Sequence, residues 1–333
     1  MDVDAFVAAH QAEWSRLDQL VRRRQRLSGA EVDELVASYH RTATHLSILR
    51  SSGQDAALVG RLSATVARAR AAAVGGAHAS TWRSVGRFFA VTFPAAVYRT
   101  RWWWLATAAG SLMLALLIGL WLARTPAAMT GLAGSARQQA AYVNNEFRQY
   151  YSQYSGQSFG SEVWTHNSFL AAQMLISGIF LGLPTLLLLL ANALDLGSAG
   201  ALMITHGKGA VFFALILPHG MLELSSVFLA AAAGLRLGWR IIDPGPRPRS
   251  QALAEEGRSA VTIALGLVLA LLVSGSLEAF VTPSSLPTWA RILIGGCAEA
   301  AFLGYVIGAG RRAVLAGLSA DIDEAPDVIA VVG

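Results

Sequence analysis

Long apolar segments with few charged side chains recur between residues 102 and 312 of this chain. The first runs from Leu105 to Ala123 and directly follows Trp102-Trp103-Trp104. A helix needs about 20 apolar residues to cross the hydrocarbon core of a bilayer, and tryptophan collects at the membrane interface. We therefore expect membrane-spanning segments at about 102–123, 168–193, 209–235, 259–281 and 290–310.

The composition excludes a soluble or disordered chain. Of the 333 residues, 54% are hydrophobic and only 14% are charged, whereas soluble domains have about 25% charged residues. A disordered chain would need low hydrophobicity and a high charge. The sequence predicts an all-α fold, a polytopic helical membrane protein with an N-terminal cytoplasmic helical bundle.

Residues 1–80 contain no segment of membrane length. Phe6, Trp14 and Leu17 recur at helical spacing, and Ser28 with Glu31 forms a capping-box pattern that starts a second helix. We interpret 1–80 as a cytoplasmic helical bundle. At the other end of the chain, 313–333 is a short acidic tail.

Between this bundle and the first span, residues 81–101 mix basic and aromatic side chains. They predict an interfacial helix whose rings reach the acyl boundary and whose guanidinium groups contact lipid phosphates. A plain connector is the alternative, because basic flanks of spans are common. The lipid-surface candidates are Arg83, Arg87, Arg99 and Arg101.

The arginines constrain the topology. Basic residues precede the first span, and both the segment 236–258 and the C-terminal end carry more, so all three should be cytoplasmic and 124–165 extracytoplasmic. Five simple spans cannot satisfy this pattern. Residues 166–236 must make either three crossings, or one crossing plus a re-entrant hairpin broken at Pro218-His219-Gly220.

Several ionisable or amide side chains lie at membrane depth, where they are costly and therefore mark functional sites or buried polar networks. His219 and Glu223 are four residues apart and would share a helix face. We expect Glu223 to be buried and hydrogen-bonded to His219 or Asn192, while His206 and Lys208 mark an interfacial turn. The full candidate set is Asn167, Asn192, Pro218, His219, Gly220, Glu223, Glu278 and Glu299.

The Pro-His-Gly-x-x-Glu-Leu core at 218–224 carries a family resemblance. Together with GIFLGLPTLLLLLANALDLG before it and SLEAFVTP at 276–283, it resembles the stage II sporulation protein M family of bacterial integral membrane proteins. The arginine-rich composition fits an actinobacterial member. The resemblance implies a multi-pass plasma-membrane protein, and in endospore formers a membrane anchor for peptidoglycan-degrading partners.

Two function classes remain open. In the favoured one the chain is a scaffold or anchor for cell-envelope partners, not an enzyme, and its buried polar residues hold the spans together. In the other it is a transporter or a metal-dependent intramembrane enzyme centred on His219 and Glu223, with Glu278 and Glu299 available to complete a shell. We predict no cofactor and no metal site, with His219 and Glu223 the only metal candidates. The expected partners are the lipid bilayer and cell-envelope proteins or a second copy of the chain, with no nucleic acid.

Overall fold

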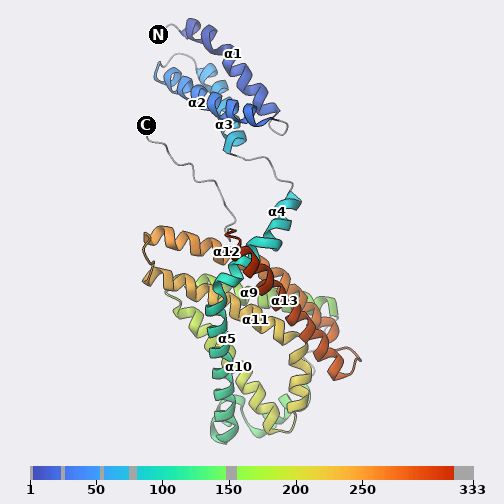
Figure 1. Ribbon diagram of the computed structural model, residues 1–333. Helices are drawn as coiled ribbons and strands as arrows, with labels where there is room; N and C mark the ends of the chain where they lie inside the picture. The colour runs from blue at the N-terminus through green and yellow to red at the C-terminus, as the bar shows by residue number, and fades with distance from the viewer. Residues whose placement is uncertain (1–2, 24–26, 53–55, 75–80, 148–155, 319–333) are drawn as a thin grey trace. The chain divides into compact units, whose positions relative to one another are not determined.

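The computed structural model describes residues 3–23, 27–52, 56–74, 81–147 and 156–318, which form helices and no strand (Figure 1). The chain divides into two compact units, Met1–Gly86 and Arg87–Gly333. The predicted all-α architecture is confirmed. Five of the described helices are long and apolar enough to cross a membrane.

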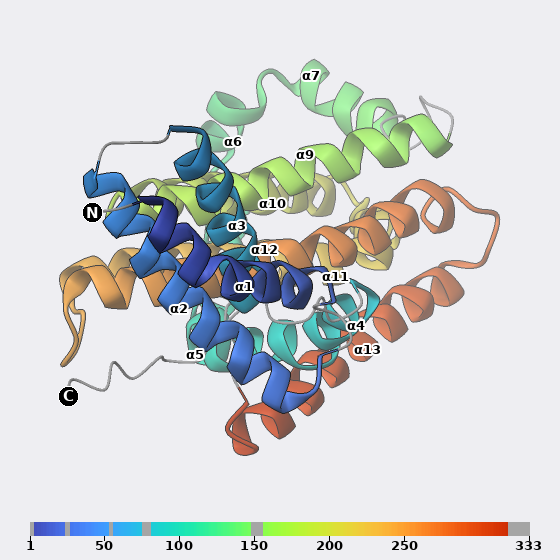
Figure 2. The same ribbon diagram turned by 90° about the horizontal axis from the view of Figure 1, so that it is seen from above.

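The first unit is a bundle of α1 (Val3–Arg22), α2 (Gly29–Ser52) and α3 (Ala56–Val74), followed by α4 (Thr81–Arg87). The apolar stripe predicted from the sequence is its core, in which Leu17 and Leu35 are buried. Figure 2 shows α1 to α3 from above.

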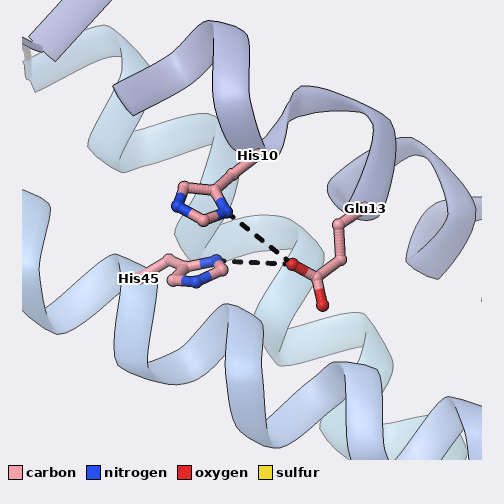
Figure 3. Close-up of side chains that lie close together, drawn as sticks. All are labelled: His10, Glu13 and His45. Atoms are coloured by element: carbon pink, nitrogen blue, oxygen red, sulfur yellow. Dashed lines mark ion pairs between the residues drawn. The ribbon is translucent and has the colours of Figure 1, made fainter. Parts of the chain in front are cut away.

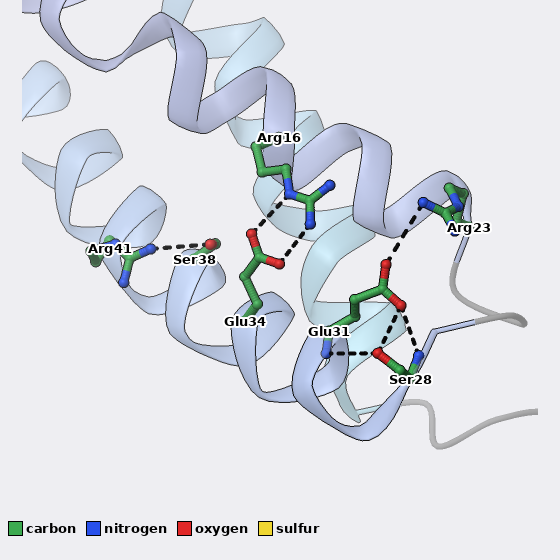
Figure 4. A network of polar contacts seen from close by, with 7 residues as sticks. All are labelled: Arg16, Arg23, Ser28, Glu31, Glu34, Ser38 and Arg41. Carbon is green, nitrogen blue, oxygen red and sulfur yellow. Dashed lines mark hydrogen bonds and ion pairs between the residues drawn. The ribbon is translucent and has the colours of Figure 1, made fainter.

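Polar contacts on the surface of the bundle fix the start of α2 and its register against α1 (Figure 4). The backbone N–H of Ser28 donates to Glu31 at 2.8 Å, which confirms the capping box. Arg16 on α1 donates to both oxygens of Glu34 on α2, at 2.8 and 2.7 Å. Because both carboxylate oxygens accept a hydrogen bond from one guanidinium, this ion pair fixes the orientation of α1 relative to α2 as well as pairing opposite charges.

The second unit consists mainly of six long helices: α5 (Phe93–Arg124), α9 (Gly156–Ile176), α10 (Leu183–Thr205), α11 (Gly209–Ile242), α12 (Arg249–Ser276) and α13 (Thr288–Leu315). Short helices α6 (Pro126–Ala133) and α7 (Ala136–Ala141) and a π-helical turn η3 (Tyr142–Glu146) follow α5. The π-helical turns η2 (Phe88–Thr92) and η5 (Leu277–Val281) flank α5 and α12, and the 3-10 turn η4 (Ser177–Ile179) follows α9.

The sequence placed one apolar segment at 168–193, but the structure divides it between two helices. The backbone reverses after η4, where Leu181 and Gly182 have φ of 58° and 74°. The buried Thr185 hydroxyl then donates to the carbonyl of Met174 at 2.8 Å, which ties α10 back to α9. A glycine at 182 suits the left-handed conformation that this reversal requires.

The expected hairpin at Pro218-His219-Gly220 is absent. Pro218 lies inside the continuous helix α11 and is buried. A proline within a membrane helix is tolerated where neighbouring groups satisfy the backbone around it. Beside the proline, Ser274 of α12 donates its hydroxyl to the carbonyl of His219 at 3.1 Å, which ties α12 to this part of α11.

Close glycine contacts show how α9, α10 and α11 run. Gly178, after α9, touches Gly234 near the end of α11, whereas Gly160, near the start of α9, touches Ala279 beyond α12. α9 therefore runs the length of the unit, and α10 and α11 run back and forth beside it, joined at the turn that the sequence predicted at 206–208. Of the two topological solutions, the one with a hairpin broken at Pro218 is not seen here; α10 and α11 are among the five helices of membrane length, and α9 is not.

Residues 81–101, expected to form one interfacial helix, are divided between α4, η2 and the start of α5. α4, η2 and α5 follow one another without a gap, and Phe93 is buried inside the second unit. A Cβ added to Gly266 of α12 would meet the Phe93 ring, so the ring fills the space that this glycine leaves. Residues from Phe93 onward therefore belong to the packed helices of the second unit.

Apolar side chains cover the outside of the second unit. Leu105, Leu117 and Trp121 on α5 are more than half exposed, as are Leu187 on α10 and Leu265 on α12. A soluble protein rarely exposes so large a contiguous apolar area. This outer surface is suited to contact with the acyl chains of a bilayer.

Candidate functional site

The polar residues predicted at membrane depth converge around the middle of α11. Pro218, His219 and Gly220 are buried there, and Glu223 follows one turn later on the same face. Glu278 projects from the π-helical turn η5 and is also buried. One ligand atom from each of His219, Glu223 and Glu278 lies within 4.8 Å of the other two.

The two nitrogens of the His219 ring face different partners. Nδ1 is hydrogen-bonded to the Thr282 hydroxyl at 3.1 Å, and Nε2 lies 3.9 Å from Glu278 Oε2. The Thr282 hydroxyl also lies within donating distance of the Leu277 carbonyl, at 3.3 Å. This pattern favours a ring that donates from Nδ1 and presents the lone pair of Nε2 toward Glu278.

Glu223 is hydrogen-bonded to the side chain of Asn167 on α9, a different partner from the expected His219 or Asn192. Its second oxygen, Oε2, is buried and has no hydrogen-bond partner. A buried carboxyl oxygen without a partner is costly. Among the described residues, Oε2 of Glu299 is likewise buried without a hydrogen-bond partner.

Glu299 does not join this cluster. Its Oε1 accepts a hydrogen bond of 2.6 Å from the Ser225 hydroxyl, while the Ser225 carbonyl accepts one of 2.9 Å from the Trp104 indole. This second network connects α13, α11 and α5. The structure therefore brings together three of the four ionisable candidates and uses Glu299 to hold another group of helices.

Two cavities meet at Glu223. One of about 720 Å³ is lined by His219 and Glu223 and also by Tyr142 and Glu146 of η3. The other, of about 340 Å³, is lined by Asn167, Glu223 and Glu278. Asn192 and Asp195 on α10 line both, so polar side chains continue from the α7–η3 region to the buried carboxyls.

At the mouth of the larger cavity, burial and the nearby Glu146 and Asp195 raise the pKa of the Tyr142 phenol. Tyr142 is therefore a neutral donor there at pH 7. His219, Glu223 and Glu146, which line this cavity with Tyr142, could together hold a proton or a cation in it.

The proposed lipid-surface arginines have different environments. Arg87 is exposed, and Arg99 donates to the carbonyl of Leu318 at 3.3 Å. The guanidinium of Arg101 lies over the Tyr98 ring, 4.1 Å from its centroid. The side chain of Arg83 lies outside the described residues.

Sequence reasoning missed the hydroxyl partners of the cluster, Thr282 and Ser274, because serine and threonine occur throughout apolar helices and no spacing sets these two apart.

The sequence analysis also left all of 236–258 between two expected spans, although only 243–248 separates α11 from α12. Glu256 lies 3.0 Å from Arg236 and 3.5 Å from Arg240, across the two helices. The available signal for these ion pairs was the presence of three acidic residues, Asp243, Glu255 and Glu256, among the five arginines of this segment.

Two family models and one archaeal protein match parts of this chain. The family model described as Stage II sporulation protein M matches residues 108–283, and a model for a domain of unknown function, DUF8413, matches residues 4–75. An uncharacterized protein of Methanocaldococcus jannaschii is 25% identical over 126 residues, which cover 36% of this chain and 69% of that protein. No solved structure matches.

Proposed function

Because the chain belongs to the stage II sporulation protein M family, we propose that it is a multi-pass plasma-membrane protein that acts as a scaffold or anchor for cell-envelope partners. The observation that carries this proposal is the division of the chain into two compact units. One is an apolar set of long helices suited to a bilayer, and the other is an amphipathic bundle that can bind a partner outside it.

The contacts between helices at membrane depth support a structural role for many of the polar residues. His219 contacts Thr282, and Ser225 contacts Glu299, in each case from one helix to another. Polar contacts of this kind hold membrane helices together. An anchor requires membrane helices that keep their positions relative to one another.

We place the bundle and the 243–248 connection in the cytoplasm. α5, α10 and α12 run in one direction through the second unit and α9, α11 and α13 in the other, which brings the end of α13 next to the start of α5 at Gly310 and Pro94. We count α9 as a sixth pass beside the five helices of membrane length. Six passes put the N-terminus, the 243–248 connection and the C-terminus on one side, where the arginines favour the cytoplasm. Residues 124–165 are then extracytoplasmic.

Cross-linking in native membranes tests the anchor role. The full chain and a version that starts at Thr81 would be compared after cross-linking, by mass spectrometry of the captured proteins. We expect the shorter chain to insert normally and to lose a defined set of envelope partners. An identical partner set for both chains would contradict the role of the bundle.

A transporter or a metal-dependent intramembrane enzyme centred on Pro218–Glu223 is the second candidate function. One observation favours it: the unsatisfied Oε2 of Glu223 lies beside two polar cavities. Intramembrane carboxyls in water-accessible cavities carry protons or ions in many transporters. Substitution of Glu223 by glutamine separates the two functions, as described below.

A further inference from the structure

The N-terminal bundle contains a second group of metal-ligating side chains, far in sequence from the membrane motif. His10 and Glu13 lie one turn apart on α1, and His45 faces them from α2 (Figure 3). Glu13 Oε2 is 3.9 Å from Nδ1 of His10 and 4.0 Å from Nδ1 of His45. All three ligand atoms lie within 4.8 Å of one another.

We propose that His10, Glu13 and His45 form a binding site for a divalent transition-metal ion of the zinc class. Two imidazoles and one carboxylate are a donor set that Zn²⁺ and Co²⁺ prefer and that Mg²⁺ and Ca²⁺ do not. Three protein ligands leave a coordination position for water or for a group from a partner.

The distances fit an ion better than direct contacts. Both nitrogens are more than 3.5 Å from the carboxylate oxygen, beyond hydrogen-bonding range. Tetrahedral coordination with bonds of about 2.0–2.1 Å places neighbouring ligand atoms about 3.3 Å apart. The two nitrogen–oxygen distances must therefore shorten by roughly 0.6–0.7 Å, and the two nitrogens, which lie within 4.8 Å of each other, must also approach; rotations of the partly exposed side chains can supply these changes.

The surroundings of the site orient one of its histidines. The indole N–H of Trp14 donates to His45 Nδ1 at 3.2 Å, and Phe6 meets the His45 ring edge-on. Coordination at Nδ1 would replace the Trp14 hydrogen bond with a stronger bond to the ion.

Solvent can reach the site. The side chain of His10 is 31% exposed and that of Glu13 is 26% exposed, against 13% for His45. An ion can thus enter from the α1 side without unfolding the bundle.

The positive charge of Arg41 works against cation binding at this site. Its guanidinium forms an ion pair with Oε1 of Glu13, the oxygen that faces away from the two histidines, and also bonds the Ser38 hydroxyl. Oε2 stays directed at the imidazoles, but the positive charge of Arg41 lowers the affinity for a cation. Removal of this charge should therefore tighten binding, which a purely aromatic packing role for the histidines does not predict.

The test uses the full chain in detergent, stripped with a chelator and titrated with Co²⁺, whose visible absorption reports coordination. We expect one ion to bind with a Co²⁺ band that Zn²⁺ displaces and Ca²⁺ does not. His10→Ala and His45→Ala should each weaken binding at least tenfold, while His40→Ala, an exposed histidine on the same helix as His45, should leave it unchanged. Arg41→Gln should bind several-fold more tightly.

Circular dichroism shows whether each variant remains folded, and Zn²⁺ should raise the melting temperature of the wild-type chain and of His40→Ala but not of His45→Ala. Glu13→Gln provides a variant of nearly equal size in case an alanine variant unfolds. The proposal is overturned if no Co²⁺ band forms, if the band survives in folded His10→Ala and His45→Ala, or if His40→Ala loses it equally.

Discussion

Gly295 of α13 packs directly against the backbone of Pro218 in α11: a Cβ on Gly295 would lie 2.1 Å from the Pro218 carbonyl oxygen. No real side chain tolerates that distance, so the two helices can meet here only because residue 295 is a glycine. Small residues at such crossings let membrane helices approach closely. The contact places α13 beside the Pro-His-Gly segment of α11.

Gly295→Ala should therefore destabilise the protein by about 1–3 kcal/mol, because the added methyl group forces the two backbones apart. Gly304, on the same helix, has open space around it, and Gly304→Ala should be neutral or slightly stabilising. Thermal unfolding of both variants in detergent measures the difference. Equal melting temperatures for the two would show that α13 does not pack on Pro218 as described.

Glu223→Gln distinguishes the two candidate functions. In a scaffold, glutamine keeps the hydrogen bond to Asn167 and the fold, so protein level and phenotype should both match wild type. Glu223→Leu should lower the protein level, with a cost of about 1–3 kcal/mol, because the Asn167 amide loses its partner. A normal level of Glu223→Gln with a null phenotype would instead support a transporter or an enzyme.

The six-pass topology predicts opposite labelling at two serines. In a Cys297→Ser background, cysteine placed at exposed Ser250, at the start of α12, should resist an impermeant thiol reagent in intact cells. Cysteine placed at exposed Ser285, between α12 and α13, should react with it. Strong labelling at position 250 would contradict the cytoplasmic assignment of the 243–248 connection.

The N-terminal bundle should lose stability in acid. Hydrogen bonds from Arg22 and Arg68 lower the pKa of Asp18, and Arg16 lowers the pKa of Glu34. A carboxyl whose folded-state pKa is lowered stabilises the fold above its unfolded pKa of about 4, and this contribution disappears as the pH falls through the folded-state value.

Melting of a 1–76 fragment by circular dichroism should therefore show a lower melting temperature at pH 3 than at pH 6. Asp18→Asn should reduce that pH dependence without abolishing the helical signal. A melting temperature that stays constant across this range would argue against these ion pairs.

Local sequence determined much of the fold. A run such as 105–123 must be a membrane helix because no other structure satisfies its backbone in hydrocarbon. Ser28 with Glu31 starts α2, and the turn at 206–208 separates α10 from α11, because each depends on residues within one helical turn. The helical spacing of His219 and Glu223 also placed both on one face, as the structure shows.

Tertiary packing decided the rest. The chain reverses at Leu181-Gly182 and not at Pro218, because the contact of Gly178 with Gly234 and the contacts around Pro218 outweigh local helix-breaking tendencies. Glu278 joins His219 while Glu299 binds Ser225, and His45 faces His10. These pairings depend on how far each helix is rotated and shifted against its neighbour, which is set by side-chain volumes along the whole contact and cannot be read from any single segment.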